Sequence, residues 1–117
     1  MDFNVTLDRF KLVSGLADEE VSKWFQVIRD ASEYVYSLVT NDSLTDSDKT
    51  RLDKAAGIYA YYKYLLYSQS TENSFSVGEV SVTENKDRVK EAQQMWEKEK
   101  SDIGDIITAT NFLFKRI

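Results

Sequence analysis

Apolar residues recur at helical spacing over a long stretch near the start of the chain, residues 18–39. An α-helix advances about 100° per residue, so positions three and four apart gather on one side. Asp18, Glu19 and Glu20 open the stretch, and negative charge stabilises a helix N-terminus. We therefore predict one amphipathic helix here. Its apolar face holds Val21, Trp24, Phe25, Ile28, Ala31, Val35, Leu38 and Val39.

A second helix is predicted at about 46–70, after a polar loop. Thr45 precedes it and Asp48 follows three residues later, which is a variant of the capping box that begins many helices. The apolar residues of this segment again follow the helical period. Its predicted core face holds Leu52, Ala55, Ile58, Tyr59, Tyr62, Leu65 and Leu66.

Residues 75–83 follow a different pattern, in which apolar residues alternate with small or polar ones. Phe75 and Val77 alternate before Gly78, and Val80 and Val82 alternate after it. A period of two is typical of extended backbone, and an isolated glycine in such a run indicates a bend. The pattern therefore predicts a short extended loop or hairpin that bends at the glycine.

Three shorter segments complete the predicted elements. Residues 3–12 are expected to form a short helix or an arm that ends near Gly15. Helices are also expected at about 84–101 and, after a break at Gly104, at about 105–115. The first of these two carries Val89, Ala92, Met95 and Trp96 as a narrow apolar stripe, and the second carries Ile106, Ile107, Leu113, Phe114 and Ile117.

The length of 117 residues suits a single domain. The chain has no proline and only four glycines, so its helices lack the two residues that most often interrupt them. We predict an all-α fold, a small bundle of about four helices with the extended loop or hairpin around 75–83. Residues 1–117 form one helical domain, with 1–14 as the N-terminal helix or arm. Residues 103–117 form a C-terminal helix that either completes the bundle or docks on a partner.

The residue types exclude most catalytic chemistry. The chain has 15 Lys and Arg, 20 Asp and Glu, a formal charge of −5, and neither His nor Cys. It therefore cannot form a Ser-His-Asp triad, a Cys-His pair or an ordinary structural zinc site. A calcium loop that begins at Asp42 would need an oxygen ligand and a glycine where Leu44 and Ser47 stand. We predict no enzymatic activity and no catalytic, cofactor-binding or metal-binding residues.

Charge distribution and hydropathy also bear on nucleic acids and membranes. No segment concentrates Lys and Arg as a phosphate-binding surface requires, so specific nucleic-acid binding is not expected. The first residues lack the basic and apolar regions of a secretion signal. No segment matches the run of about 20 apolar residues that crosses a membrane, so no membrane association is expected.

Apolar residues in unusual places point to protein–protein contact. Ala60, Tyr64 and Tyr67 fall about 100° or more beyond the core face of their helix, where a solvated helix carries charges. Tyrosine is enriched at interfaces, although a core helix whose phenols reach the edge of a small protein gives the same pattern. The C-terminal helix is apolar on most sides, which indicates a partner or a central place in the bundle. The predicted interface residues are Ala60, Tyr64, Tyr67, Phe75, Val77, Phe112, Phe114 and Ile117.

Three stretches of the chain resemble the small helical head–tail connector (adaptor) proteins of tailed bacteriophages. They are residues 16–21 leading into 28–35, the Ala-Ala-Gly-Ile-Tyr-Ala-Tyr-Tyr helix at 55–62, and the Phe-Ser-Val-Gly-Glu-Val-Ser-Val-Thr segment at 75–83 followed by a charged helix with Ala92 and Trp96. Together they cover about residues 10–105. Many relatives have Gly-Asp where this chain has Gly78-Glu79, a departure that keeps the acid.

The resemblance implies a structural virion protein that forms a ring of identical subunits under the portal and links capsid to tail. Its implied partners are further copies of itself, the portal, and tail-side neck proteins. Its implied location is the host cytoplasm during assembly and afterwards the neck of the virion. An acidic channel wall would repel DNA phosphates and let the DNA slide.

Three alternatives from other classes remain open at this point. The chain would serve as an intracellular helical regulator or interaction module if its tyrosines bound one protein partner. A carboxylate-only metal enzyme would be stabilised by magnesium, manganese or calcium. A DNA-binding protein would be retained on DNA in a salt-dependent way.

Overall fold

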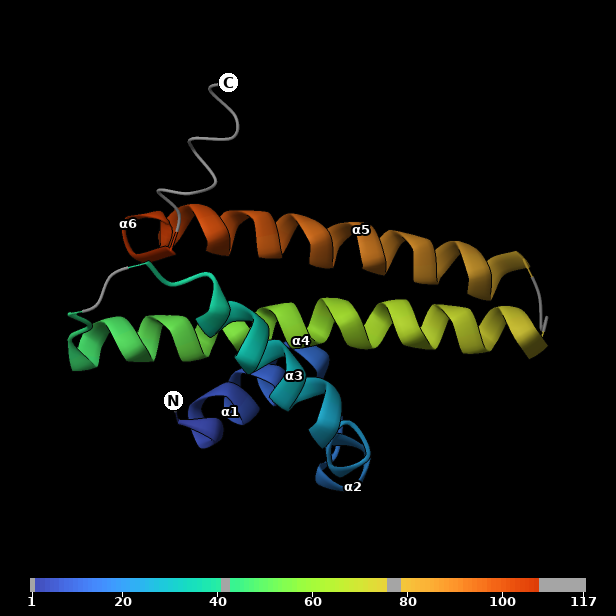
Figure 1. The fold of residues 1–117 in the computed structure, drawn as a ribbon. Coiled ribbons are helices and arrows are strands. Elements are labelled where there is room, and N and C mark those ends of the chain that lie inside the picture. The colour runs from blue at the N-terminus through green and yellow to red at the C-terminus, as the bar shows by residue number, and fades with distance from the viewer. Residues whose placement is uncertain (1, 41–42, 76–78, 108–117) are drawn as a thin grey trace.

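The computed structural model describes residues 2–40, 43–75 and 79–107, and for 69–75 and 79–86 the backbone alone. This part of the chain is all-α and contains no strand, which confirms the predicted fold class. The helices are α1 (Phe3–Ser14), α2 (Asp18–Ser22), α3 (Phe25–Ser37), α4 (Asp46–Phe75), α5 (Glu79–Asp102) and α6 (Gly104–Ile107) (Figure 1).

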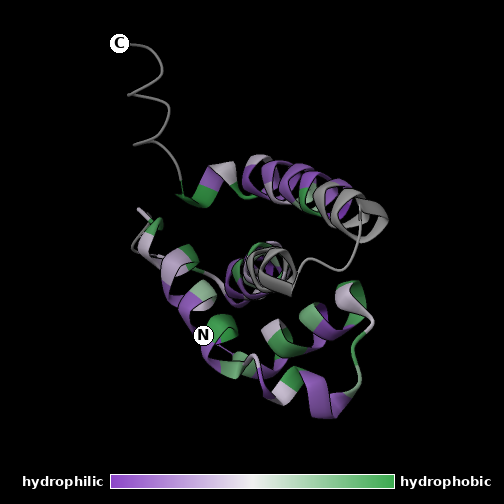
Figure 2. Ribbon diagram, turned by 90° about the vertical axis from the view of Figure 1, so that its right-hand side faces the viewer, coloured by the Kyte–Doolittle hydropathy of each residue, from purple (hydrophilic) through white to green (hydrophobic). Residues whose placement is uncertain are grey.

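The long helix α4 is the central element of the fold. It pairs with α5, which runs back along it in the opposite direction (Figure 1). The view along this pair in Figure 2 shows the N-terminal helices on the side of α4 that faces away from α5. α4 contacts α1, α3 and α5, so it is covered on both sides and forms the middle of three layers.

The single helix predicted over residues 18–39 is wrong, because the structure divides it into α2 and α3. The backbone N–H of Lys23 bonds the carbonyl of Glu20 at 3.1 Å, and that of Trp24 bonds Val21 at 2.9 Å. These i to i+3 bonds tighten the chain into a turn, and such turns mark breaks between α-helices. After the break Phe25 is exposed rather than part of the apolar face, and its ring packs edge-on against Phe3.

Local capping follows the predicted signals. The N–H of Thr45 donates to Asp48 Oδ2 at 3.2 Å, and the N–H of Asp48 donates to Thr45 Oγ1 at 3.0 Å. This reciprocal pair is the predicted capping box, and it satisfies donors that a helix start otherwise leaves without partners. α1 ends at Gly15, whose φ of 70° is in the left-handed region that glycine adopts without strain.

The prediction of an extended segment at 75–83 is wrong for the residues on both sides of 76–78. α4 continues to Phe75 and α5 begins at Glu79, so residues 79–83 are helical rather than extended. Residues 76–78 lie outside the described residues. Adding a residue to an existing helix costs little, so two long helices override a short period-two pattern. α5 therefore starts before the predicted residue 84.

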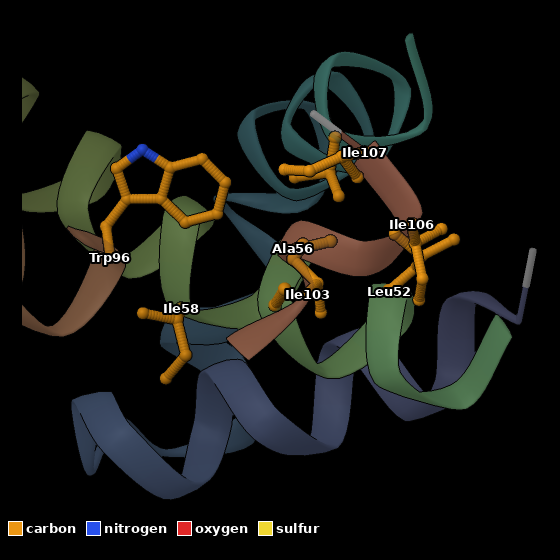
Figure 3. Close-up of a cluster of buried hydrophobic side chains, with 9 residues drawn as sticks. Leu52, Ala56, Ile58, Trp96, Ile103, Ile106 and Ile107 are labelled. Atoms are coloured by element: carbon orange, nitrogen blue, oxygen red, sulfur yellow. The ribbon is translucent and has the colours of Figure 1, made fainter. Parts of the chain in front are cut away.

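The hydrophobic core has two parts that share α4. One lies among α3, α4, α5 and α6 and contains Val35, Leu52, Ala55, Ala56, Ile58, Trp96, Ile103, Ile106 and Ile107 (Figure 3). The other lies among the N-terminal helices and α4 and contains Phe10, Val21, Ile28, Ala31 and Ala60. Most residues predicted for the apolar faces are thus buried. The break at Gly104 is confirmed, and the predicted helix beyond α6 lies outside the described residues.

Hydrogen bonds and close packing hold α1 against α4. The hydroxyl of Thr6 donates to the Asp53 carbonyl at 3.0 Å, and the buried Asp53 carboxylate accepts the N–H of Asp2 at 3.0 Å and the Tyr36 hydroxyl at 2.9 Å. Burial and the bond to Asp53 raise the pKa of Tyr36. A Cβ atom added at Gly57 would lie 2.6 Å from Arg9 Cβ and 2.8 Å from the Thr6 carbonyl oxygen. Glycine is therefore what allows the two helices to approach this closely.

An arginine joins α4 and α5 at the end of the pair where α4 begins and α5 ends. The guanidinium of Arg51 bonds Asp105 Oδ1 at 2.8 Å and Oδ2 at 3.2 Å, and it also donates to the Asp102 carbonyl. The same arginine holds the pKa of Asp105 below its usual value. The N–H of Thr40 donates to the Ile106 carbonyl at 3.3 Å. The start of α4, the end of α5 and the loop after α3 are thereby joined.

Candidate functional site

An open groove runs along one edge of the contact between α3 and α4. Its volume is about 190 Å³. α3 and α4 supply all of its lining residues, and we name it the aromatic groove. They are Val27, Asp30, Ala31, Tyr34, Tyr59, Lys63 and Tyr67.

Stacked rings form the wall of the aromatic groove. Tyr34 and Tyr59 stack with ring centroids 4.7 Å apart, and Tyr59 lies 4.7 Å from the buried Trp96 of α5. Aromatic pairs of this kind contribute about 0.5–1.5 kcal/mol beyond the area they bury. Tyr34 and Tyr67 nevertheless remain 43% and 49% exposed. The groove is therefore backed by packed aromatic rings, and Tyr34 and Tyr67 leave part of their surface open to solvent.

Two charged side chains line the aromatic groove. The Lys63 Nζ lies 6.0 Å from the centroid of Tyr59 and 5.7 Å from that of Tyr67, within reach of cation–π attraction. Asp30 is exposed and accepts a hydrogen bond from Gln26 at 2.9 Å. Burial raises the pKa of Tyr59, so its phenol stays protonated at neutral pH. These groups suit the binding of a polypeptide surface rather than proton transfer.

A second pocket lies between α1 and α4, with a volume of about 230 Å³. We name it the Leu12 pocket. Leu12 projects from α1 with 71% of its surface exposed, the largest exposure among the large apolar side chains of the described residues. The pocket is lined by Val5, Asp8, Arg9, Leu12 and Lys54.

The two surfaces lie on opposite sides of α4. Lys54 lines the Leu12 pocket and Lys63 lines the aromatic groove. They are nine residues apart in the sequence, which is about two and a half helical turns. Their side chains therefore leave α4 about 180° apart, one beside α1 and the other beside α3. The molecule therefore has a different surface hollow on each of these sides.

The structure places the predicted interface residues in three kinds of position. The prediction that Ala60 lies at an interface is wrong. Ala60 is fully buried in the core, because α1 and α3 cover that side of α4. Tyr64 is partly buried and packs edge-on against Phe10 at 5.8 Å and Trp24 at 4.7 Å. Tyr67 is exposed in the aromatic groove. The side chain of Phe75 and all of Val77, Phe112, Phe114 and Ile117 lie outside the described residues.

Tyr67 is the one residue among those lining the two surfaces that was predicted at an interface, and Tyr34, Lys63 and Leu12 are among those that were not. A signal for the groove is present, since Tyr59, Lys63 and Tyr67 recur every four residues and therefore share one side of α4. The exposure of Leu12 had no such signal. An apolar residue in a short helix indicates burial until the position of the neighbouring helix is known.

Within the described residues, no three acidic side chains are grouped so that they could hold a metal ion. None of the helices, over the residues that the structure describes, is long and apolar enough to cross a membrane. Comparisons with family models, with curated proteins and with solved structures find no significant match. The fold and the two surfaces thus define an all-α protein with apolar surface patches outside its core.

Proposed function

We propose that this protein is a head–tail connector (adaptor), a structural virion protein that forms a ring under the portal and links capsid to tail. The observation that carries the proposal is the distribution of exposed apolar side chains. Four large ones are exposed in the described residues, Leu12, Phe25, Tyr34 and Tyr67. Three of the four lie in the two surfaces on opposite sides of α4.

A subunit in a ring needs two different contact surfaces, one for each neighbour. Apolar patches rimmed by polar groups are typical of such contacts. The resemblance of residues 10–105 to the connector family supports the same function from the sequence. The formal charge of −5 suits a wall along which DNA slides without being held. The proposed location is the host cytoplasm during assembly and then the neck of the virion.

The test is assembly of the purified chain, alone and mixed with the portal protein of the same genome. Electron microscopy and mass measurement are expected to show rings, or subunits bound to the portal in its symmetry. A protein that stays monomeric at high concentration and does not bind the portal contradicts the proposal. Salt-dependent retention on DNA by such a monomer would instead favour the DNA-binding alternative.

A variant pair links this test to the surface. Tyr67→Ser removes an exposed ring from the aromatic groove, and Gln94→Ser changes an exposed residue of α5 outside both surfaces. We expect the first to weaken assembly by about tenfold, as loss of an interface aromatic commonly does. The control is expected to assemble like the wild type. Equal assembly by both variants would show that the groove does not carry the contact.

A further inference from the structure

We propose that the aromatic groove of one subunit receives Leu12, which projects beside the Leu12 pocket, from a second copy of this chain. The inference rests on the proposed function and specifies which surfaces meet in the ring. The occupant of the groove is thus the outer side of α1 in a neighbouring subunit, with Leu12 inserted beside Tyr34 and Tyr67.

The placement of the two surfaces favours this pairing. The two surfaces lie on opposite sides of α4. When the groove of one subunit contacts the Leu12 pocket of another, the first subunit still has a free Leu12 pocket and the second still has a free groove. Such a head-to-tail contact repeats, and it closes into a ring when the rotation between neighbours allows. A contact between two identical grooves would use the same surface twice and stop at a dimer.

The exposed Leu12 side chain and the apolar lining of the groove also suit each other. Leu12 projects from its helix, whereas the rings of Tyr34, Tyr59 and Tyr67 line a hollow. Val5 lies two turns before Leu12 on the same side of α1, with the charged Asp8 and Arg9 between them, so Leu12 is the apolar group that projects. An aliphatic side chain that enters an aromatic pocket is a frequent anchor of protein interfaces.

The exposed charged residues of the two surfaces include one pair of opposite sign, Asp30 in the aromatic groove and Lys54 in the Leu12 pocket. Two cations, Arg9 and Lys54, and one acid, Asp8, line the Leu12 pocket. The cation of the aromatic groove, Lys63, lies over two of its own rings, which leaves Asp30 as the exposed acid. Because the chain as a whole is acidic, copies repel one another unless cations meet acids locally. We assign Asp30 and Lys54 as the pair that fixes the orientation of the contact.

Mixing two variants tests the pairing directly. Tyr67→Glu places a charge in the groove and Leu12→Glu places one in the pocket, and both positions are exposed, so the fold is retained. Each variant alone is expected to self-associate at least about tenfold more weakly than the wild type. An equimolar mixture is expected to form a dimer and nothing larger, because only one intact groove and one intact pocket meet.

Three results overturn the inference. The first is a mixture that remains monomeric under conditions in which the wild type self-assembles, and the second is a groove or pocket variant that assembles like the wild type. The third is failure of the wild type to assemble alone or on a portal, which also removes the proposed function. If the wild type assembles while both variants are unaffected, the function stands and the assigned contact fails. Gln94→Glu adds the same charge outside both surfaces and serves as the control.

A charge exchange gives a second readout that does not depend on apolar surface. Asp30→Lys and Lys54→Glu are each expected to weaken self-association, and the double variant is expected to recover most of the wild-type affinity. Circular dichroism shows whether each variant keeps its helices. A double variant no better than the single ones would show that these two side chains do not face each other across the contact. Where the wild type assembles only on a portal, the same variants are compared by the number of subunits bound per portal ring.

Discussion

The contacts that α4 makes with α1 and with α3 are made by side chains of different size. α1 lies against Gly57 so closely that no Cβ fits there, and a buried carboxylate at Asp53 receives two donors beside it. Along the edge toward α3, the rings of Tyr59 and Tyr67 line the open aromatic groove. Side-chain size along one helix therefore decides where a second helix lies directly on its backbone and where aromatic rings line an open surface. Each prediction below tests one side of this difference.

The largest effect is expected at the core contact between α1 and α4. Phe10 is fully buried and packs edge-on against Tyr64. Phe10→Ala removes a ring from between α1 and α4, and such truncations cost about 3–5 kcal/mol of unfolding free energy. Denaturant unfolding of the monomer measures this loss. A loss below about 1 kcal/mol would mean that α1 is not held as the structure shows.

Gly57→Ala tests the close approach itself. The new methyl group would meet Arg9 Cβ and the Thr6 carbonyl, and moving backbone apart costs about 1–3 kcal/mol. The higher helix propensity of alanine offsets up to about 1 kcal/mol of that cost. We expect a net loss of about 1–2 kcal/mol in the same unfolding assay. Lys49→Ala, at an exposed position of the same helix, is expected to stay within about 0.5 kcal/mol of the wild type.

Tyr34→Ala tests the open side. It removes the ring stacked on Tyr59, which is expected to cost about 1 kcal/mol of monomer stability because the ring is only half buried. Tyr34→Phe keeps the ring and is expected to retain that stability. A loss as large as that of Phe10→Ala would place Tyr34 in the structural core and remove the contrast between the two sides.

The smallest effect on stability is expected for Tyr67→Ser. The ring is half exposed, and an exposed contact with a lysine contributes only about 0.5–1 kcal/mol. Its stability is therefore expected within about 1 kcal/mol of the wild type while its assembly is weakened. Stability and assembly measured on the same sample separate the two roles. A loss of both together would indicate that Tyr67 supports the fold.

The helical period predicted much of the core, because burial of an amphipathic face depends on the order of residues alone. Val35, Leu52, Ala92 and Trp96 are buried as expected. The break at Trp24 was not predictable in this way, because the apolar pattern continues through it at helical spacing. It depends on how α2 and α3 pack against α4, where the Trp24 ring contacts Tyr64. The helical backbone on both sides of residues 76–78 likewise depends on the packing of two long helices, which the local alternation does not reveal.

The candidate site was harder to predict than the core for a related reason. Ala60 and Tyr67 are seven residues apart and share one side of α4 in the sequence pattern. The structure buries the first and exposes the second, because the N-terminal helices cover only part of the length of α4 (Figure 1). A pattern gives the direction of a side chain from its helix axis. It does not give the length over which a neighbouring helix lies along that axis.

The join at Arg51 means that α4 and α5 are connected twice, once by the peptide chain between Phe75 and Glu79 and once by hydrogen bonds at the far end. Ile103, between α5 and α6, and Ile106 and Ile107 of α6 reinforce this second connection from within the core. A protease that cuts the chain between the two helices would then leave fragments that stay together in native buffer. The same design would allow the protein to be produced as two separate polypeptides, each with its own label, that reconstitute one fold when mixed.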